Sequence, residues 1–217
     1  MKRIYLIMLM IAAMMVSCNP KDDDNSNSGG GNGGGNDQYN GYEYVDLGLP
    51  SGLKWATCNV GATSPEDYGD YFAWGETSPK AEYTIENSIT YGEQMSDISG
   101  NAQYDAATAN WGGSWRMPTK DEMQELLDYC EFEWTQVNGV CGSKVIGPNG
   151  SGIFLPAAGG RYGSSLYNAG GNGLYWSSTP DDYGYDRFAY CLYFGGGSGY
   201  VGDYFRSNGQ TVRPITE

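Results

Sequence analysis

Tyrosine, aspartate, glycine, serine and asparagine crowd the C-terminal part of the chain, between Tyr162 and Arg206. The chain has no lysine after Lys144 and no glutamate between Glu133 and Glu217. Aromatic rings provide large, rigid contact areas, and serine, glycine and asparagine provide adaptable hydrogen bonds, a combination typical of antibody paratopes. We therefore expect this segment to form a face that binds a glycan or a protein. The side chains expected to be exposed on that face are Tyr183, Tyr185, Asp186, Tyr200, Asp203 and Tyr204.

An alternative interpretation places many of these rings in the protein core. Tyr190, Leu192 and Phe194 alternate along the chain as the inward face of a β-strand does. Both interpretations stay open at the level of sequence.

Several kinds of catalytic and metal chemistry are excluded or disfavoured by composition. The chain has no histidine, which excludes Ser-His-Asp and Cys-His catalysis and histidine-ligated metals. Acidic residues are plentiful, but no spacing singles out the pair of facing carboxylates that a glycosidase needs. Asp181, Asp182 and Asp186 have oxygens that suit calcium, although a solvated loop is the favoured interpretation. We expect no catalytic residue, no metal site and no cofactor.

The N-terminus has the pattern of an export signal. Lys2 and Arg3 precede an almost unbroken apolar run from Ile4 to Val16, so residues 1–17 are predicted to be a secretory signal peptide. Cys18 follows a small residue, as in a bacterial lipobox. We expect Cys18 to become the first residue and to carry acyl chains such as palmitate, which anchor the protein in a membrane.

The segment after Cys18 is polar. Asn19 to Asp24 is similar to the signal that sends lipoproteins of Bacteroidetes to the outward face of the outer membrane; a solvated linker is the alternative. Residues 18–41 are predicted to form a lipidated, flexible tether, because they contain too few apolar side chains to fold. Residues 42–217 are predicted to form one domain.

The acidic charge limits the possible partners. Without Lys2 and Arg3 the chain keeps 10 of its 12 basic residues against 26 acidic ones, a formal charge of −16. Nucleic acid and anionic membrane surfaces are poor partners for such a protein, because phosphate contacts need lysine and arginine. The membrane is therefore expected to contact only the lipid anchor.

Four cysteines remain in the predicted domain, an even number that is compatible with disulfides in an exported protein. The Asn138-Gly139 turn should place Gln136 opposite Cys141, away from Cys130, which argues against a bridge between those two cysteines. The bridge expected instead joins Cys58 and Cys130, since both should face the core.

The predicted elements indicate the α+β class. Thr119 and Glu122 form a capping box at the start of the main helix, and a second short helix is expected near Asp105 to Ala109. Most of the chain after Gly147 reads as short strands between glycine-rich loops. The strands are predicted at Tyr42–Asp46, Leu53–Asn59, Tyr71–Trp74, Trp134–Val137, Val140–Ile146, Gly152–Leu155, Leu174–Ser177, Phe188–Phe194, Tyr200–Phe205 and Gln210–Ile215.

Six blocks of the sequence match one known pattern: Val45–Ala62, Tyr68–Glu76, Trp115–Leu127, Asn138–Arg161, Tyr175–Thr179 and Val212–Ile215. Together they resemble the Fibrobacter succinogenes major paralogous domain, a family found in surface lipoproteins of gut Bacteroidetes. That family is similar to the C-type lectin fold, including variable proteins of diversity-generating retroelements. The resemblance implies a C-type-lectin-like domain with one main helix and a mostly antiparallel sheet. Arg116 and Arg213 lie in these blocks and are expected to form structural ion pairs.

Two other functions remain as alternatives to ligand binding. One is a structural subunit of a fimbria or another surface assembly. The other is an oxidase of the formylglycine-generating type, to which the fold is also similar. That chemistry requires two close cysteines in the C-terminal groove, where only Cys191 lies, with Cys141 as the other candidate.

Overall fold

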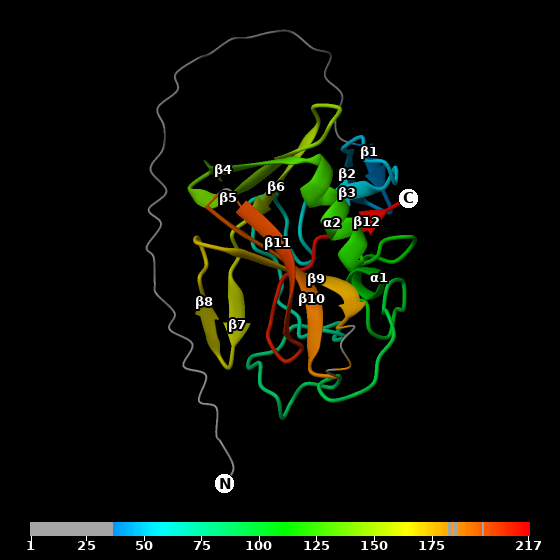
Figure 1. Cartoon of the computed structure of the whole chain (residues 1–217), viewed down its shortest axis with the longest axis vertical. Coiled ribbons are helices and arrows are strands. Elements are labelled where there is room, and N and C mark those ends of the chain that lie inside the picture. The colour runs from blue at the N-terminus through cyan, green and yellow to red at the C-terminus, as the bar shows by residue number, and fades with distance from the viewer. Residues whose placement is uncertain (1–36, 182–183, 185, 197) are drawn as a thin grey trace.

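The computed structural model describes residues 37–181, 184, 186–196 and 198–217. Within them, antiparallel strands predominate and two short helices accompany them, an α+β architecture (Figure 1). The helices are α1 (Ala106–Trp111) and α2 (Lys120–Tyr129). Neither helix is long and apolar enough to cross a membrane.

One sheet joins the two ends of the described chain. Its strand order is β1-β2-β3-β12, so β1 and β12 form its two edges, and the C-terminus lies at the end of β12 in Figure 1. The sheet starts at Asp37, so the folded part begins before the predicted boundary at Tyr42. A stack of the Tyr42 and Trp111 rings, 3.8 Å apart, fastens this sheet to α1. The strands are β1 (Asp37–Tyr39), β2 (Tyr42–Asp46), β3 (Lys54–Ala56) and β12 (Ile215–Thr216).

A second sheet contains the predicted hairpin. Its strands are β4 (Glu131–Val137), β5 (Val140–Ile146) and β6 (Gly152–Pro156). The Asn138-Gly139 turn has positive φ at both residues, as a two-residue hairpin requires. Gln136 pairs with Cys141, which confirms the predicted register.

The third sheet, with strand order β11-β10-β9, lies at the centre of the molecule. It is made of β9 (Gly173–Pro180), β10 (Phe188–Gly195) and β11 (Ser198–Phe205). One face of this sheet packs Trp176, Ala189 and Cys191 into the first core cluster, together with Trp74. The other face packs Tyr175, Leu192 and Phe194 into the second core cluster, against α2. Both clusters are buried, so the C-terminal segment forms the middle of the fold and not only loops on its surface.

The helix prediction is confirmed at its first turn. The Thr119 side chain accepts the Glu122 backbone N–H, and the Glu122 side chain accepts the Thr119 backbone N–H. Met123 and Leu126 are fully buried in the second core cluster.

The segment Tyr71–Trp74 does not form the predicted strand. Phe72 makes a single bridge to Gln210, and the Trp74 backbone N–H bonds to the Arg206 carbonyl. Phe72 and Trp74 are fully buried, so side-chain packing and not a ladder holds the segment in place. The predicted strand Gln210–Ile215 shortens in the same way to β12.

The predicted bridge between Cys58 and Cys130 is wrong, because both are free thiols. Cys130 follows the last residue of α2 and packs against the second core cluster. The Cys58 sulfur lies 3.6 Å from the Thr57 hydroxyl, just after β3. The expectation that Cys130 does not pair with Cys141 is confirmed.

Candidate functional site

Four of the six residues predicted to bind a ligand are described by the structure, and these four do not share one exposed face. Tyr183 and Tyr185 lie outside the described residues. Asp186 precedes β10, and its backbone carbonyl accepts a hydrogen bond from the Gly92 N–H at 2.7 Å. Tyr200, Asp203 and Tyr204 lie on β11, but successive side chains of a strand point to opposite faces.

Asp203 lies on the face opposite to the two tyrosines. It pairs with Tyr190 of β10, whose ring lies under the Lys120 ammonium, 4.6 Å from the ring centroid. Asp203 therefore belongs to the face that α2 covers. It is exposed there, but it does not approach Tyr200 or Tyr204 from the same side.

Tyr204 is not the surface residue that was predicted. It pairs with Ala189, is half-buried and packs against the first core cluster. Burial, the largest cause, raises the pKa of its hydroxyl. Its main contribution is to packing.

Tyr200 is 52 % exposed, as predicted for a ligand contact. Its ring lies beside that of Tyr193 on β10, with 5.0 Å between the ring centroids. A Cβ atom added at Gly202 would come within 2.7 Å of the Tyr200 ring. The absence of a side chain at Gly202 therefore lets the ring lie along β11.

A row of side chains crosses the central sheet on this face. Leu174 of β9 pairs with Tyr193, and Tyr193 pairs with Tyr200. Residues directly opposite in an antiparallel ladder share a face. The three side chains therefore lie in line across the three strands.

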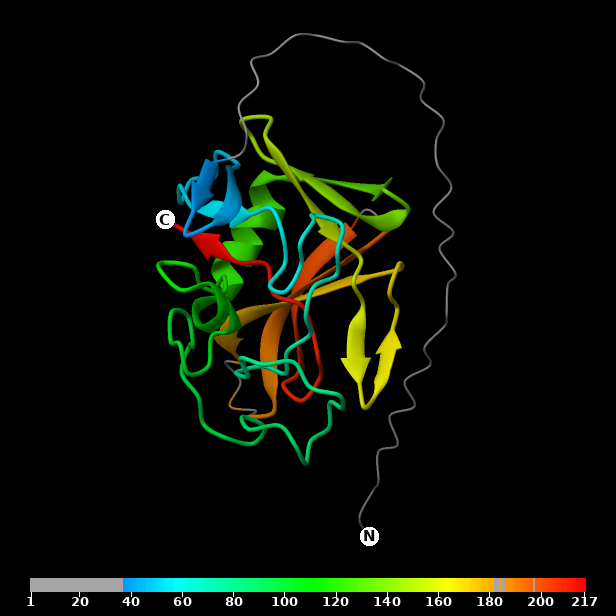
Figure 2. The ribbon, with the colours of Figure 1, turned by 180° about the vertical axis from the view of Figure 1, so that it is seen from behind.

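The hairpin of β7 (Gly160–Tyr162) and β8 (Ser165–Tyr167) extends this row. Its pairing puts Tyr162 and Tyr167 on the same face as Gly160. A Cβ atom added at Gly160 would lie 3.4 Å from the Gly209 carbonyl oxygen and 3.7 Å from Leu174 Cδ1, so this face of the hairpin adjoins Leu174. Tyr162 and Tyr167 are 63 % and 53 % exposed. The hairpin lies beside the central sheet in Figures 1 and 2, joined to it by the bridge between Gly159 and Gly173.

We call the set Tyr162, Tyr167, Tyr193 and Tyr200 the tyrosine row. The sequence predicted a binding face within residues 162–208 but did not single out Tyr162, Tyr167 or Tyr193. A signal for β7 and β8 was present, because Gly163-Ser164 between two tyrosine-bearing segments is a typical two-residue hairpin turn.

The tyrosine row is uncharged. Residues 162–180 and 188–202, which carry it, contain no lysine, arginine, aspartate or glutamate. The neighbouring Arg161 lies on the other face of the hairpin, with its guanidinium 5.0 Å from the centroid of the Tyr71 ring. Burial raises the pKa of Tyr193 and of Tyr200, so both hydroxyls are neutral at physiological pH.

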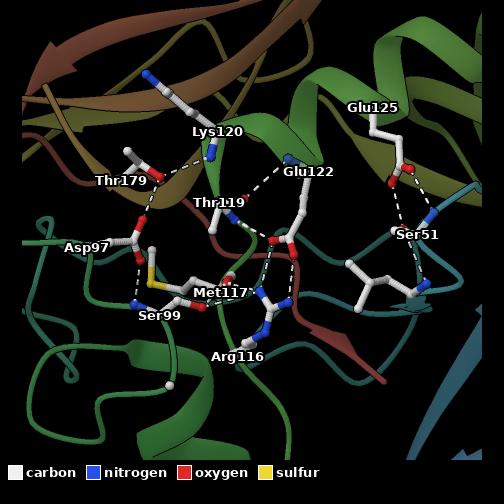
Figure 3. Close-up of polar contacts among 12 residues, drawn as sticks. Ser51, Asp97, Ser99, Arg116, Met117, Thr119, Lys120, Glu122, Glu125 and Thr179 are labelled. Carbon is white, nitrogen blue, oxygen red and sulfur yellow. Dashed lines mark hydrogen bonds and ion pairs between the residues drawn. The ribbon is translucent and has the colours of Figure 1, made fainter. Parts of the chain in front are cut away.

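A cluster of polar side chains at the start of α2 has a structural role (Figure 3). Arg116 forms a two-bond ion pair with Glu122, at 2.6 and 2.8 Å, which confirms the ion pair expected for Arg116. Asp97 accepts a hydrogen bond from the Thr179 hydroxyl, which in turn accepts one from the Lys120 backbone N–H. These bonds hold the chain before α2 to the helix and to the end of β9.

Arg213 is buried but is not in the ion pair that was expected. Its guanidinium donates to the side-chain oxygen of Asn59 and to the carbonyls of Ala56, Thr57 and Phe154, at 2.6–3.0 Å. Burial, the largest cause, lowers its pKa. Arg213 therefore fastens β3 to β6 through neutral oxygens.

No metal centre accompanies the tyrosine row in the described part of the chain. Among these residues, no three or more cysteine and acidic side chains come together in a way that could hold an ion.

Comparison with known proteins assigns the chain to a family. The family model described as "Lcl C-terminal domain" matches residues 48–216, which covers all the strands of the central sheet and the tyrosine row. Neither the curated proteins nor the solved structures contain a match. From the extent of the family match, the chain belongs to the family of Lcl C-terminal domains.

Proposed function

We propose that this protein is a cell-surface lipoprotein whose folded domain binds a glycan or a protein through the tyrosine row. The observation that supports binding is that Tyr193 and Tyr200 share one face of the β10–β11 hairpin, while Tyr162 and Tyr167 share one face of the neighbouring β7–β8 hairpin. Exposed tyrosines that become desolvated are frequent hot spots of binding energy. Three of these four rings are more than half exposed, so a ligand can still desolvate them.

The proposed fold is C-type-lectin-like, of the Fibrobacter succinogenes major paralogous type. The sequence blocks that resemble that family support this proposal. Two of the blocks, Trp115–Leu127 and Asn138–Arg161, contain the capped start of α2 and the strands β5 and β6.

The proposed location is the outward face of the outer membrane, with Cys18 as the lipidated residue. The signal pattern of residues 1–17 and the acidic run that ends at Asp24 support it. The polar composition of residues 19–36 suits a flexible tether, and a chain of that length spans about 25 Å on average.

The binding proposal is tested with the mature chain carrying Cys18→Ala, which lacks the proposed lipid. The protein is applied to arrays of glycans and of host proteins, with Tyr162→Ala and Tyr200→Ala beside it. Tyr129→Ala is the matched control, because Tyr129 is 54 % exposed at the end of α2, on the other side of the central sheet. We expect at least one ligand that binds the unsubstituted domain and Tyr129→Ala but does not bind Tyr162→Ala or Tyr200→Ala. A ligand that all three variants bind equally would refute the role of the tyrosine row.

The location is tested separately in cells. The wild-type chain should incorporate labelled palmitate and should be removed by protease added to intact cells. The Cys18→Ala chain should not incorporate the label and should leave the membrane fraction. Protection of the wild-type domain in intact cells would contradict the outward location.

A further inference from the structure

We propose that the ligand of the tyrosine row is an uncharged polysaccharide, bound by stacking of its sugar rings and without calcium. This inference rests on the proposed function and names the chemical class of the ligand. It follows from the charge, the geometry and the polar neighbours of the row.

The charge of the row argues against an anionic ligand. Sulfated or carboxylated sugars are recognised by arginine and lysine, which form charge-assisted hydrogen bonds with the anion. Residues 162–180 and 188–202 provide no such side chain. Arg161, the nearest in sequence, is turned toward Tyr71 on the other face. The domain carries a large excess of acidic residues, which adds a repulsive field for anions.

The absence of charged side chains from the row also argues against a protein ligand that binds through charge. An acidic protein associates faster with a basic partner when the acidic side chains lie on the binding surface itself. Here Asp203, the acidic residue of β11, lies on the face opposite to Tyr200. The row therefore has no carboxylate of its own strands with which to attract a basic protein.

The geometry of the row suits a linear chain of rings. Tyr193 and Tyr200 lie side by side on neighbouring strands, and Tyr162 and Tyr167 share the hairpin face whose Gly160 adjoins Leu174. The face of an aromatic ring is electron-rich and attracts weakly polarised C–H groups. The faces of sugar rings carry such C–H groups at regular intervals along a polysaccharide. Strands hold side chains more rigidly than loops do, so little order is lost on binding.

Neutral polar side chains that could hydrogen-bond with sugar hydroxyls lie next to the row. Ser164, Ser165 and Asn168 are exposed next to Tyr162 and Tyr167. Asn172 is close enough to Tyr193 to hydrogen-bond with its hydroxyl. Hydroxyl and amide groups both donate and accept hydrogen bonds, as sugar hydroxyls do.

The test uses the mature chain with Cys18→Ala and two panels of polysaccharides, compared by affinity electrophoresis and by calorimetry. The uncharged panel contains amylose, laminarin, neutral arabinoxylan and mannan. The anionic panel contains heparin and polygalacturonate. We expect binding to at least one uncharged polymer, with an affinity that changes less than twofold between 50 and 500 mM salt (about a threefold change in Debye length) and does not change with EDTA.

The variants connect this binding to the row. Tyr162→Ala and Tyr200→Ala should each lower the affinity about tenfold or more, whereas Tyr162→Phe and Tyr200→Phe should stay within about threefold, because phenylalanine keeps the ring. Tyr129→Ala should bind as the wild type does. Circular dichroism of each variant checks that the fold is intact.

The outcomes separate this inference from the proposed function. Binding only to the anionic panel or only to a protein, with loss in Tyr162→Ala and Tyr200→Ala, overturns the inference and leaves the proposed function standing. Loss of uncharged-polymer binding with EDTA also overturns it. Binding of any class that Tyr162→Ala and Tyr200→Ala leave unchanged overturns the proposed function as well.

Discussion

Tyr193 and Tyr200 face each other across the ladder of β10 and β11, with ring centroids 5.0 Å apart and ring planes inclined by 30°. Four residues further along β11, Tyr204 lies on the same face but packs against the first core cluster. The same face is therefore exposed at one end, where we propose that a ligand binds, and packed against the core at the other. Tyr200 and Tyr204 differ in burial because the first core cluster packs against the Tyr204 ring, and not because of their residue type.

Tyr204→Ala should destabilise the fold, and Tyr200→Ala should not. Removing a half-buried ring from a core leaves a cavity, so we expect Tyr204→Ala to lower the free energy of unfolding by about 2 kcal/mol. Tyr200→Ala should change it by less than about 0.5 kcal/mol. Urea denaturation of both variants measures these values. Equal losses would mean that Tyr200 is also part of the packing.

Gly202→Ala should weaken ligand binding without removing any ring. The added methyl group would lie 2.7 Å from the Tyr200 ring, which must then swing toward solvent. The effect should disappear in the background of Tyr200→Ala, because the double variant has no ring to displace. Calorimetric titration of the two single variants and the double variant gives this coupling. Additive losses would show that Gly202 acts on binding by another route.

Glu122→Gln should destabilise the protein near neutral pH and much less in acid. Burial alone would raise the pKa of Glu122, but hydrogen bonds from Arg116 and Thr119 outweigh it and lower the pKa below the ordinary value of 4.5. A lowered pKa contributes stability above the unfolded-state pKa, and this stability is lost as the pH falls through the folded-state pKa.

Glutamine keeps the capping box but not the charge. We therefore expect a loss of about 2 kcal/mol at pH 7, and the difference between wild type and variant should shrink as the pH drops below 4.5. Urea denaturation at a series of pH values between neutrality and strong acid measures it. A difference that stays constant with pH would contradict a role of the charge.

Arg213→Met should be far more damaging than Arg116→Met. Arg213 is fully buried, and its loss leaves four oxygen acceptors without their donor. Each unsatisfied buried acceptor costs about 1–3 kcal/mol, so the sum approaches the whole stability of a domain. Arg116 is partly exposed, and water can replace part of its ion pair. Soluble expression and melting temperature of the two variants, compared with those of the wild type, test which substitution is more damaging. A milder effect for Arg213→Met would contradict the structural role assigned to its four bonds.

Cys130 should react slowly with alkylating reagents in the folded protein. Burial, followed by the neighbouring Glu125, raises the pKa of its thiol to about 11. The reactive thiolate is then roughly one molecule in a thousand at pH 8. We expect iodoacetamide to label Cys130 at least tenfold more slowly in the native protein than in urea, by peptide mass mapping. The same map without reduction should contain no peptide that links Cys58 to Cys130.

Local signals in the sequence determined the elements whose formation depends on near neighbours. The Thr119–Glu122 capping box started α2, and Asn138-Gly139 set the register of β4 and β5, because both act over a few residues. The aromatic and glycine-rich composition likewise located the region of the candidate site, and the lack of histidine excluded whole classes of chemistry.

Only the tertiary structure decided which side chains of that region meet. Alternation along β11 was readable, but which face is covered depends on α2 and the first core cluster, which are distant in sequence. Asp203 and Tyr204 were therefore both expected on the exposed binding face, although Asp203 lies on the other face of the sheet and Tyr204 is half-buried. The β7–β8 hairpin, with Tyr162 and Tyr167, lies next to the central sheet because Gly159 bridges to Gly173, a contact that no local pattern encodes. The positions of Cys58 and Cys130 depend in the same way on how β3 and α2 are placed, so their spacing in the sequence could not predict that they remain free thiols.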